Sequence, residues 1–139
     1  HSEYNRTKDP LTFYQIWIET NKKNVQPHWE SKKFPTQQAS ELTLLASGYE
    51  EDKEKALFIN QEARIYGGKV AKGTLIEHDI THQAYILASD GMFKVEDTSC
   101  KNPDSITMNK GDGAEITESG AILLRATTDC ELIVIDTIA

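Results

Sequence analysis

Short apolar runs rich in β-branched and aromatic residues alternate with turn-forming residues along most of this chain, and this pattern constrains its fold most. The runs recur roughly every 8–12 residues, and none has the length of a long helix. Such spacing predicts an all-β sandwich or barrel. The predicted strands are Leu11–Ile18, Leu42–Ala46, Ala56–Ile59, Ala63–Tyr66, Thr74–His78, Ala84–Ala88, Met92–Glu96, Ile106–Met108, Ala114–Thr117, Ala121–Ala126 and Glu131–Asp136.

Several segments between or within these runs have more specific predictions. Leu11–Ile18 carries apolar residues on both faces, so we expect a strand buried on both sides. Gly67-Gly68 predicts a turn. Asp90-Gly91 predicts a hairpin, because both residues accept positive φ. The charged stretch 50–55 predicts a solvated hairpin tip.

Charge and composition exclude several function classes. The 139 residues correspond to one domain, and the formal net charge is −7. We therefore expect no nucleic-acid partner, since a phosphate-backbone binder needs a basic stripe. No apolar run approaches the roughly 18 residues of a membrane span, so we expect no membrane partner. Cys100 and Cys130 are too far apart for a CxxC zinc site, and as free thiols they suit a cytoplasmic location.

The first residues carry the most specific chemistry. In an extended backbone His1 and Glu3 point to the same side, about 7 Å apart, so both can aim at one metal ion. Imidazole and carboxylate ligands suit a non-haem Fe(II)-type centre, but two ligands do not hold such an ion. The alternative is that His1 is a tag remnant or a frayed terminus. Because the chain starts at His1 and not at Met, we expect a fragment or a processed chain.

The spacing of His1, Glu3 and Asn5 resembles the end of the second conserved cupin motif. Leu11–Ile18, Gln26–Glu30 with Phe34-Pro35, and Asn109–Gly113 follow in the order seen in pirin-like bicupins, the family that includes quercetin 2,3-dioxygenases. The resemblance implies a cupin-type jelly-roll. It also implies that residues 1–10 are a remnant of the metal-site segment of an N-terminal cupin, and that residues 11–139 are the C-terminal cupin domain.

In that family the first cupin binds iron through three histidines and one glutamate. The resemblance makes His1 and Glu3 the last histidine and the glutamate of that set, with Glu3 also a candidate base for the flavonol 3-hydroxyl. The intact protein would then use Fe(II), or another divalent metal, to cleave a flavonol-like substrate with O₂. We expect no bound metal and no activity in this fragment alone. The alternative is a non-catalytic ligand- or protein-binding cupin module with a regulatory role, and a homodimer is possible.

The other histidines do not have the spacing of a second metal site. His78 and His82 would lie about 13 Å apart on one strand, too far to share an ion. We expect Glu77–His82 to form a polar hairpin, and His28 to be a surface or interface histidine. We expect the aromatic residues to fill the barrel; the alternative is that they line a flavonoid-sized cavity. These residues are Phe13, Tyr14, Trp17 and Tyr85.

Overall fold

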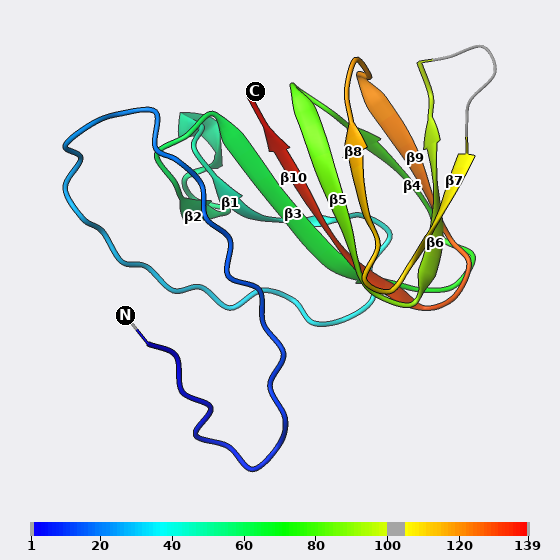
Figure 1. Cartoon of the computed structure of the whole chain (residues 1–139), viewed down its shortest axis with the longest axis horizontal. Helices are drawn as coiled ribbons and strands as arrows, with labels where there is room; N and C mark the ends of the chain where they lie inside the picture. Colours follow the sequence, from blue (N-terminus) through cyan, green and yellow to red (C-terminus); the bar gives the residue numbers. More distant parts are fainter. Residues whose placement is uncertain (1, 100–104, 139) are drawn as a thin grey trace.

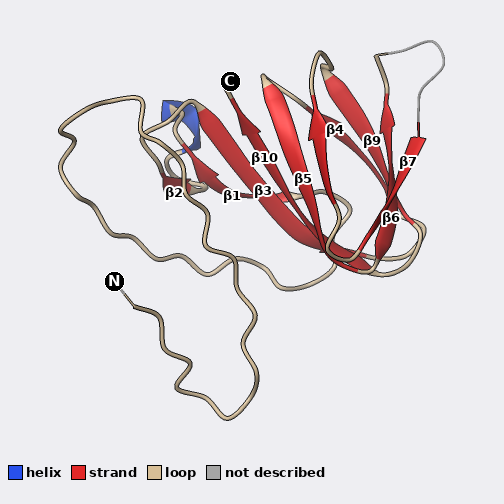
Figure 2. Ribbon diagram, in the orientation of Figure 1, coloured by secondary structure: helices blue, strands red, loops and turns tan. Residues whose placement is uncertain are grey.

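Two packed β-sheets form the body of the protein, as shown by a computed structural model that describes residues 2–99 and 105–138 (Figures 1 and 2). No α-helix occurs in these two ranges; a single 3₁₀ turn, η1 (Glu50–Asp52), follows the first strand. The all-β sandwich prediction is therefore confirmed.

The larger sheet has six strands in the order β2-β1-β3-β10-β5-β8. Its central strand is β10, which pairs antiparallel with β3 on one side and with β5 on the other. The last strand of the chain therefore holds the two halves of this sheet together. The strands are β1 (Thr43–Ser47), β2 (Leu57–Phe58), β3 (Ala63–Val70), β5 (Gln83–Asp90), β8 (Gly113–Ile116) and β10 (Cys130–Thr137).

The smaller sheet has four antiparallel strands in the order β4-β9-β6-β7. It packs against the larger sheet, and both contribute inward side chains to one core that includes Phe93, Ile122, Ile86 and Leu132. Inward and outward positions alternate along the strands, as a pleated sheet requires. The strands are β4 (Leu75–Asp79), β6 (Met92–Asp97), β7 (Ser105–Asn109) and β9 (Ala121–Ala126).

Two segments that were predicted to be turns have other structures. Asp90-Gly91 does not close a hairpin, because β5 and β6 belong to different sheets; the pair makes a tight crossover, with Gly91 at φ 71°. Gly67-Gly68 lies inside β3 and is no turn. A Cβ on Gly67 would lie 2.9 Å from Leu45 Cδ1, so the glycine leaves room for the leucine side chain.

The N-terminal third of the chain contains the main error of the strand prediction. Leu11–Ile18 forms no strand, and its side chains are exposed except for that of Ile18, which is partly buried. The segment runs across the outside of the body (Figure 1). One hydrogen bond from the segment and two from residues 19–21, which follow it, tie this part of the chain to the body. Tyr14 Oη donates to Ser89 Oγ at 3.1 Å, Gln61 Nε2 donates to the Glu19 carbonyl at 2.9 Å, and Asn21 N donates to the Asn60 carbonyl at 2.9 Å.

Candidate functional site

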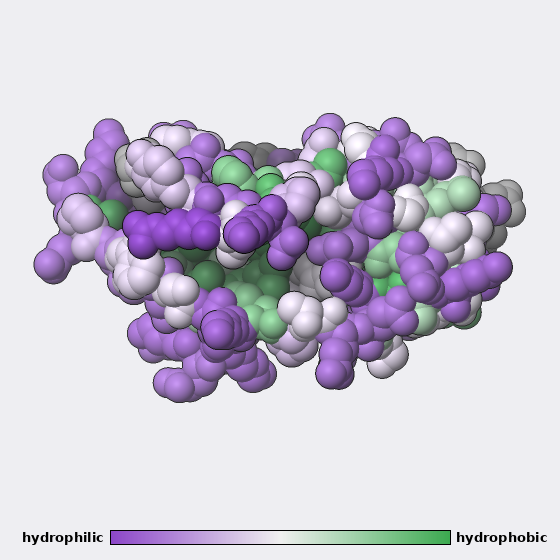
Figure 3. Space-filling view, turned by 90° about the horizontal axis from the view of Figure 1, so that it is seen from below, coloured by the Kyte–Doolittle hydropathy of each residue, from purple (hydrophilic) through white to green (hydrophobic). Residues whose placement is uncertain are grey.

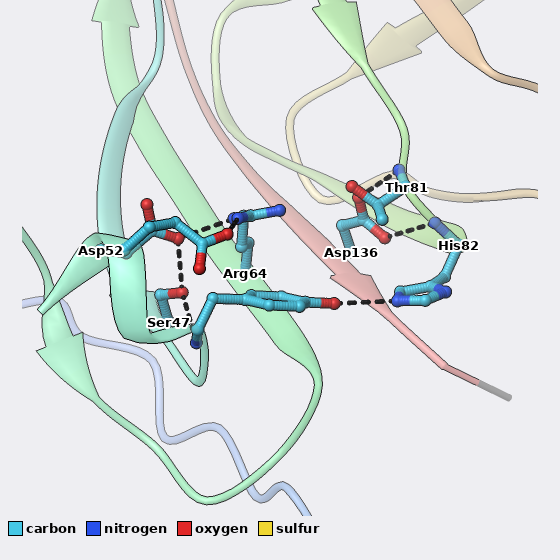
Figure 4. Close-up of polar contacts among 8 residues, drawn as sticks. Ser47, Asp52, Arg64, Thr81, His82 and Asp136 are labelled. Atoms are coloured by element: carbon cyan, nitrogen blue, oxygen red, sulfur yellow. Dashed lines mark hydrogen bonds and ion pairs between the residues drawn. The ribbon is translucent and has the colours of Figure 1, made fainter.

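Polar side chains gather at the end of the sandwich where β1, β4 and β10 end and where β3 and β5 begin (Figure 4). In β3, Arg64 and Tyr66 lie opposite Asp136 and Val134 of β10. Val134 belongs to the core, so its registered partner Tyr66 and the next alternate pair, Arg64 and Asp136, also face inward. The inward side of the six-stranded sheet therefore changes from apolar to charged at this end.

Arg64 is the cation of this cluster. Its Nε donates to Asp52 Oδ2 at 2.7 Å, and its Nη2 donates to Glu51 Oε1 at 2.8 Å. The guanidinium carbon also lies 4.0 Å from the centre of the Tyr49 ring, which is cation–π geometry. Burial alone would lower the pKa of Arg64, but the hydrogen bond and charge of Asp52 outweigh it and raise that pKa.

Asp52 is buried although it lies in the predicted solvated tip, so that prediction is wrong for this residue. Its Oδ2 also accepts a 2.7 Å hydrogen bond from Ser47 Oγ. Burial alone would raise the pKa of Asp52, but the bonds from Arg64 and Ser47 outweigh it and hold that pKa below its usual range. The 3₁₀ turn thus supplies a buried carboxylate whose Oδ2 is paired with both Arg64 and Ser47.

Tyr49 connects this ion pair to the loop between β4 and β5. Its hydroxyl lies 2.8 Å from His82 Nε2, and the backbone N–H of His82 donates to Asp136 Oδ1 at 3.0 Å. Thr81 N donates to the other oxygen of Asp136 at 2.6 Å. Asp136 is almost completely buried, and these backbone bonds satisfy its carboxylate. The cluster closes this end of the sandwich and holds the loop in place.

Among residues 2–99 and 105–138, His78 holds the one buried side-chain nitrogen or oxygen without a hydrogen-bond partner. It is 8% exposed, its ring meets that of Tyr66 edge-on at 4.5 Å, and its Nε2 has no hydrogen-bond partner. Burial lowers the pKa of His78, although Asp136 and Asp79 oppose the shift. The imidazole is therefore neutral and faces the core.

The predicted polar hairpin over Glu77–His82 is wrong for the same reason as at Gly91, since β4 and β5 lie in different sheets. Glu77 and Asp79 point outward, His78 points inward, and His82 lies in the following loop. His28 is half-exposed and lies 3.5 Å from a Glu30 oxygen, which agrees with its prediction as a surface histidine.

The predicted metal ligands lie far from this cluster in the chain. His1 is outside the described residues, and so is Cys100. Glu3 lies with Tyr4 and Asn5 beside a hollow of about 300 Å³, whose other wall is Phe13, Tyr14 and Gln15. In the described ranges, no group of three or more His, Cys, Asp or Glu side chains is placed to hold a metal ion. The described residues alone therefore do not fit an iron centre.

The aromatic residues are neither barrel filling nor the lining of an internal cavity. Phe13 and Trp17 are exposed on the N-terminal segment, and Tyr14 and Tyr85 are about half exposed on the outside of the body. The prediction that they fill the barrel is wrong, and for Phe13, Tyr14 and Trp17 the reason is that Leu11–Ile18 lies outside the barrel. Phe13 and Tyr14 instead line the open hollow beside Glu3.

Sequence reasoning missed the polar cluster, because its members are widely separated along the chain. One signal for it was present in the last predicted strand. Leu132, Val134 and Asp136 alternate on its inward face, so an acid stands where the pattern calls for an apolar residue. A charge at such a position needs a buried partner.

Residues 44–137 match the family described as the quercetinase C-terminal cupin domain. The chain belongs to this family. The match begins within β1 and ends at the last residue of β10, so it covers both sheets and excludes the N-terminal segment. The pirin-like resemblance seen in the sequence is confirmed.

Curated relatives extend the similarity over nearly the whole chain. A Zymomonas mobilis protein provisionally named a quercetin 2,3-dioxygenase is 35% identical over 140 residues, which cover 99% of this chain and 56% of that protein. A pirin-like protein of Caulobacter vibrioides is 30% identical over 98% of this chain and 56% of its own length. The cupin chain thus spans little more than half the length of these relatives.

A solved structure supports the cupin fold. Bacterial pirin YhhW from Escherichia coli, in complex with nickel(II), aligns with a TM-score of 0.73 at 20% identity, over 88% of this chain and 48% of that one. At this identity the comparison establishes the fold alone. The prediction of a cupin-type jelly-roll is confirmed.

Proposed function

We propose that this cupin is the C-terminal, metal-free half of a pirin-like protein whose complete form cleaves flavonols with O₂ and a divalent metal, with Fe(II) as the expected ion. The observation that carries the proposal is the family match over residues 44–137, together with relatives that bear the quercetin 2,3-dioxygenase name. His1 and Glu3 are the proposed contribution of this chain to the metal, with Glu3 also the candidate base.

The polar cluster supports a structural role for this half. Asp52, Arg64 and Asp136 each bond to other groups of the protein, and these bonds compete with any action on a substrate. His78 is also buried, and its Nε2 has no hydrogen-bond partner among the described residues. The cluster therefore stabilises one end of the sandwich, and in this proposal the reacting groups lie in the other half.

The activity is tested with the full-length polypeptide and with this chain alone. We expect the full-length protein, loaded with Fe(II), to consume O₂ and quercetin together, and the chain alone to consume neither. In the full-length protein, Glu3→Gln should reduce the iron bound per polypeptide at least tenfold, while Glu19→Gln, a matched exposed control, should not. Stoichiometric metal binding without flavonol consumption would reject the proposed substrate. Unchanged iron in Glu3→Gln would reject the proposed ligand.

A non-catalytic binding module is the second candidate function. The observation that favours it is the large apolar surface left exposed on the N-terminal segment, which is typical of a protein-interaction site. In this case the full-length protein would show no flavonol turnover with any divalent metal and would still bind a partner through that surface.

The location, the partners and the assembly state of the protein are also proposals. No helix in the described part of the chain has the length and apolar character to cross a membrane. We propose a cytoplasmic protein without a nucleic-acid partner, in line with the net charge of −7, and a homodimer as one assembly state. Cell fractionation tests the location, and light scattering of the purified protein tests the assembly state.

A further inference from the structure

The outer face of the smaller sheet carries two cations side by side. Lys94 of β6 and Arg125 of β9 stand directly opposite one another. Their neighbours Val95 and Leu124 belong to the core, so both cations point outward, and both are exposed. Neither makes an ion pair with another residue of the ranges 2–99 and 105–138. Like charges directly opposite one another weaken a sheet, so this pair costs stability unless a group outside the protomer compensates it.

Acidic side chains form the next row of the same face. Glu77 of β4 and Glu96 of β6 both stand opposite Leu123, one on each side of β9. These two carboxylates also make no ion pair within the described part of the chain. A basic row therefore lies directly beside an acidic row. We call the two rows together the charged face, and its members are Lys94, Arg125, Glu77, Leu123 and Glu96.

The N-terminal segment is attached to the other sheet. The hydrogen bonds that tie it to the body reach Ser89 in β5 and Asn60 and Gln61 in the loop that leads into β3. Seen from below, apolar side chains gather in a hollow on the side of the N-terminal segment, whereas the part that holds the smaller sheet presents mainly hydrophilic side chains (Figure 3). A partner of the charged face is therefore recognised by its charges.

We infer that the charged face binds the same face of a second copy of this chain. A two-fold axis that runs across the strands, between the two rows, places the basic row of each copy over the acidic row of the other. Strand β6 then lies over its counterpart in the opposite direction, so Lys94 meets Glu96 of the second copy. Arg125 lies over Leu123 of the second copy, between its Glu77 and Glu96. Each of the four charges gains an opposite charge, and the contacts are the same in both directions.

The size of the charged face suits a weak, reversible dimer. The four strands have five or six residues each, so with about 4.8 Å between strands and about 3.4 Å per residue the whole sheet face measures roughly 20 by 17 Å. Such a face is at the lower limit of specific interfaces, where complementary charge selects the partner and the register. The inference rests on the homodimer proposed above and names its surface, and it is independent of flavonol cleavage.

Charge reversal in the full-length polypeptide tests the inference by light scattering and sedimentation. The unchanged protein should be a monomer–dimer mixture whose mean mass rises with concentration. Lys94→Glu and Glu96→Lys should each weaken dimerisation at least tenfold, because each variant places like charges over one another. An equimolar mixture of the two variants should dimerise again, since every contact between positions 94 and 96 then joins opposite charges. Lys69→Glu reverses an exposed charge on the larger sheet, so it is the matched control and should have no effect.

Three results would overturn the inference: a monomer at every concentration, a dimer that both charge reversals leave intact, or a mixture of the two variants that stays monomeric. The first result also rejects the proposed homodimer. The second keeps the homodimer and assigns it to another surface. Quercetin consumption is measured on the same samples, and its presence or absence tests the proposed activity alone.

Discussion

A comparison of Gly91 and Gly111 distinguishes two physical reasons for a glycine: a positive φ, and a lack of space for a Cβ atom. Both have positive φ, 71° and 90°, which L side chains rarely adopt. At Gly111 an added Cβ would meet nothing within 4 Å. At Gly91 it would lie 2.1 Å from the Asp129 carbonyl oxygen and 2.8 Å from Cys130 Cα. A side chain at position 111 would therefore cause backbone strain alone. A side chain at position 91 would cause the same strain and also collide with backbone atoms.

We expect Gly111→Ala to lower the free energy of unfolding by about 1–2 kcal/mol, the usual cost of a left-handed non-glycine residue. Gly91→Ala should cost at least about 3 kcal/mol, because backbone atoms at the start of β10 must also move. For a domain of this size, each 1 kcal/mol lowers Tm by roughly 2–4 °C. Urea unfolding followed by circular dichroism measures both variants under one condition.

Equal losses in the two variants would refute this reasoning, since they would show that the crossover at Gly91 relaxes freely. A loss at Gly111 larger than that at Gly91 would refute it as well. Gly73→Ala is a second control, with φ 85° and nothing within 4 Å of the added Cβ, and it should match Gly111→Ala.

Three further predictions concern the core and the polar cluster. Burial lowers the pKa of His78, so as pH falls the histidine is protonated in the unfolded chain before it is protonated in the folded one. The free energy of unfolding should therefore fall below about pH 6.5, by up to 1.36 kcal/mol per pH unit. Urea unfolding at pH 8 and pH 5.5 measures this loss, which should be smaller in His78→Gln. Arg64→Met leaves the buried Asp52 carboxylate without its cation and with the Ser47 hydrogen bond, so it should cost roughly 2–4 kcal/mol. Lys110→Met, which breaks an exposed ion pair with Asp90, should leave the urea midpoint unchanged. Burial, aided by the charge of Asp129, raises the pKa of the Cys130 thiol. A thiol reagent at pH 8 should therefore modify Cys130 only as fast as the protein opens. Rapid modification of the native protein would contradict the burial of Cys130.

The sequence predicted the strands of the sandwich well, because the alternation of inward and outward residues is a local signal. The strand Ala121–Ala126 has the predicted bounds, and most others differ by one or two residues. Gly67-Gly68 was predicted to be a turn, but the glycine at position 67 instead leaves room for the side chain of Leu45 on the neighbouring strand. No local pattern records a contact of that kind.

The site was less predictable, for two physical reasons. The polar cluster joins residues as distant as Ser47 and Asp136, and only the strand register brings them to one end of the sandwich. Leu11–Ile18 has the composition of a strand, but it forms no strand and lies outside this barrel. Propensity shows that a segment suits a sheet, but it does not show which sheet.

The central position of β10 has a consequence for how the protein is made. During synthesis, β3 and β5 emerge from the ribosome some 45–65 residues before the strand that joins them. Until Cys130–Thr137 is released, the larger sheet has an open slot and two exposed strand edges, which are prone to pairing with other chains. The domain therefore completes its fold only after β10 has left the ribosome. A stop codon before Cys130 would remove β10 and leave a chain that aggregates instead of a shortened cupin.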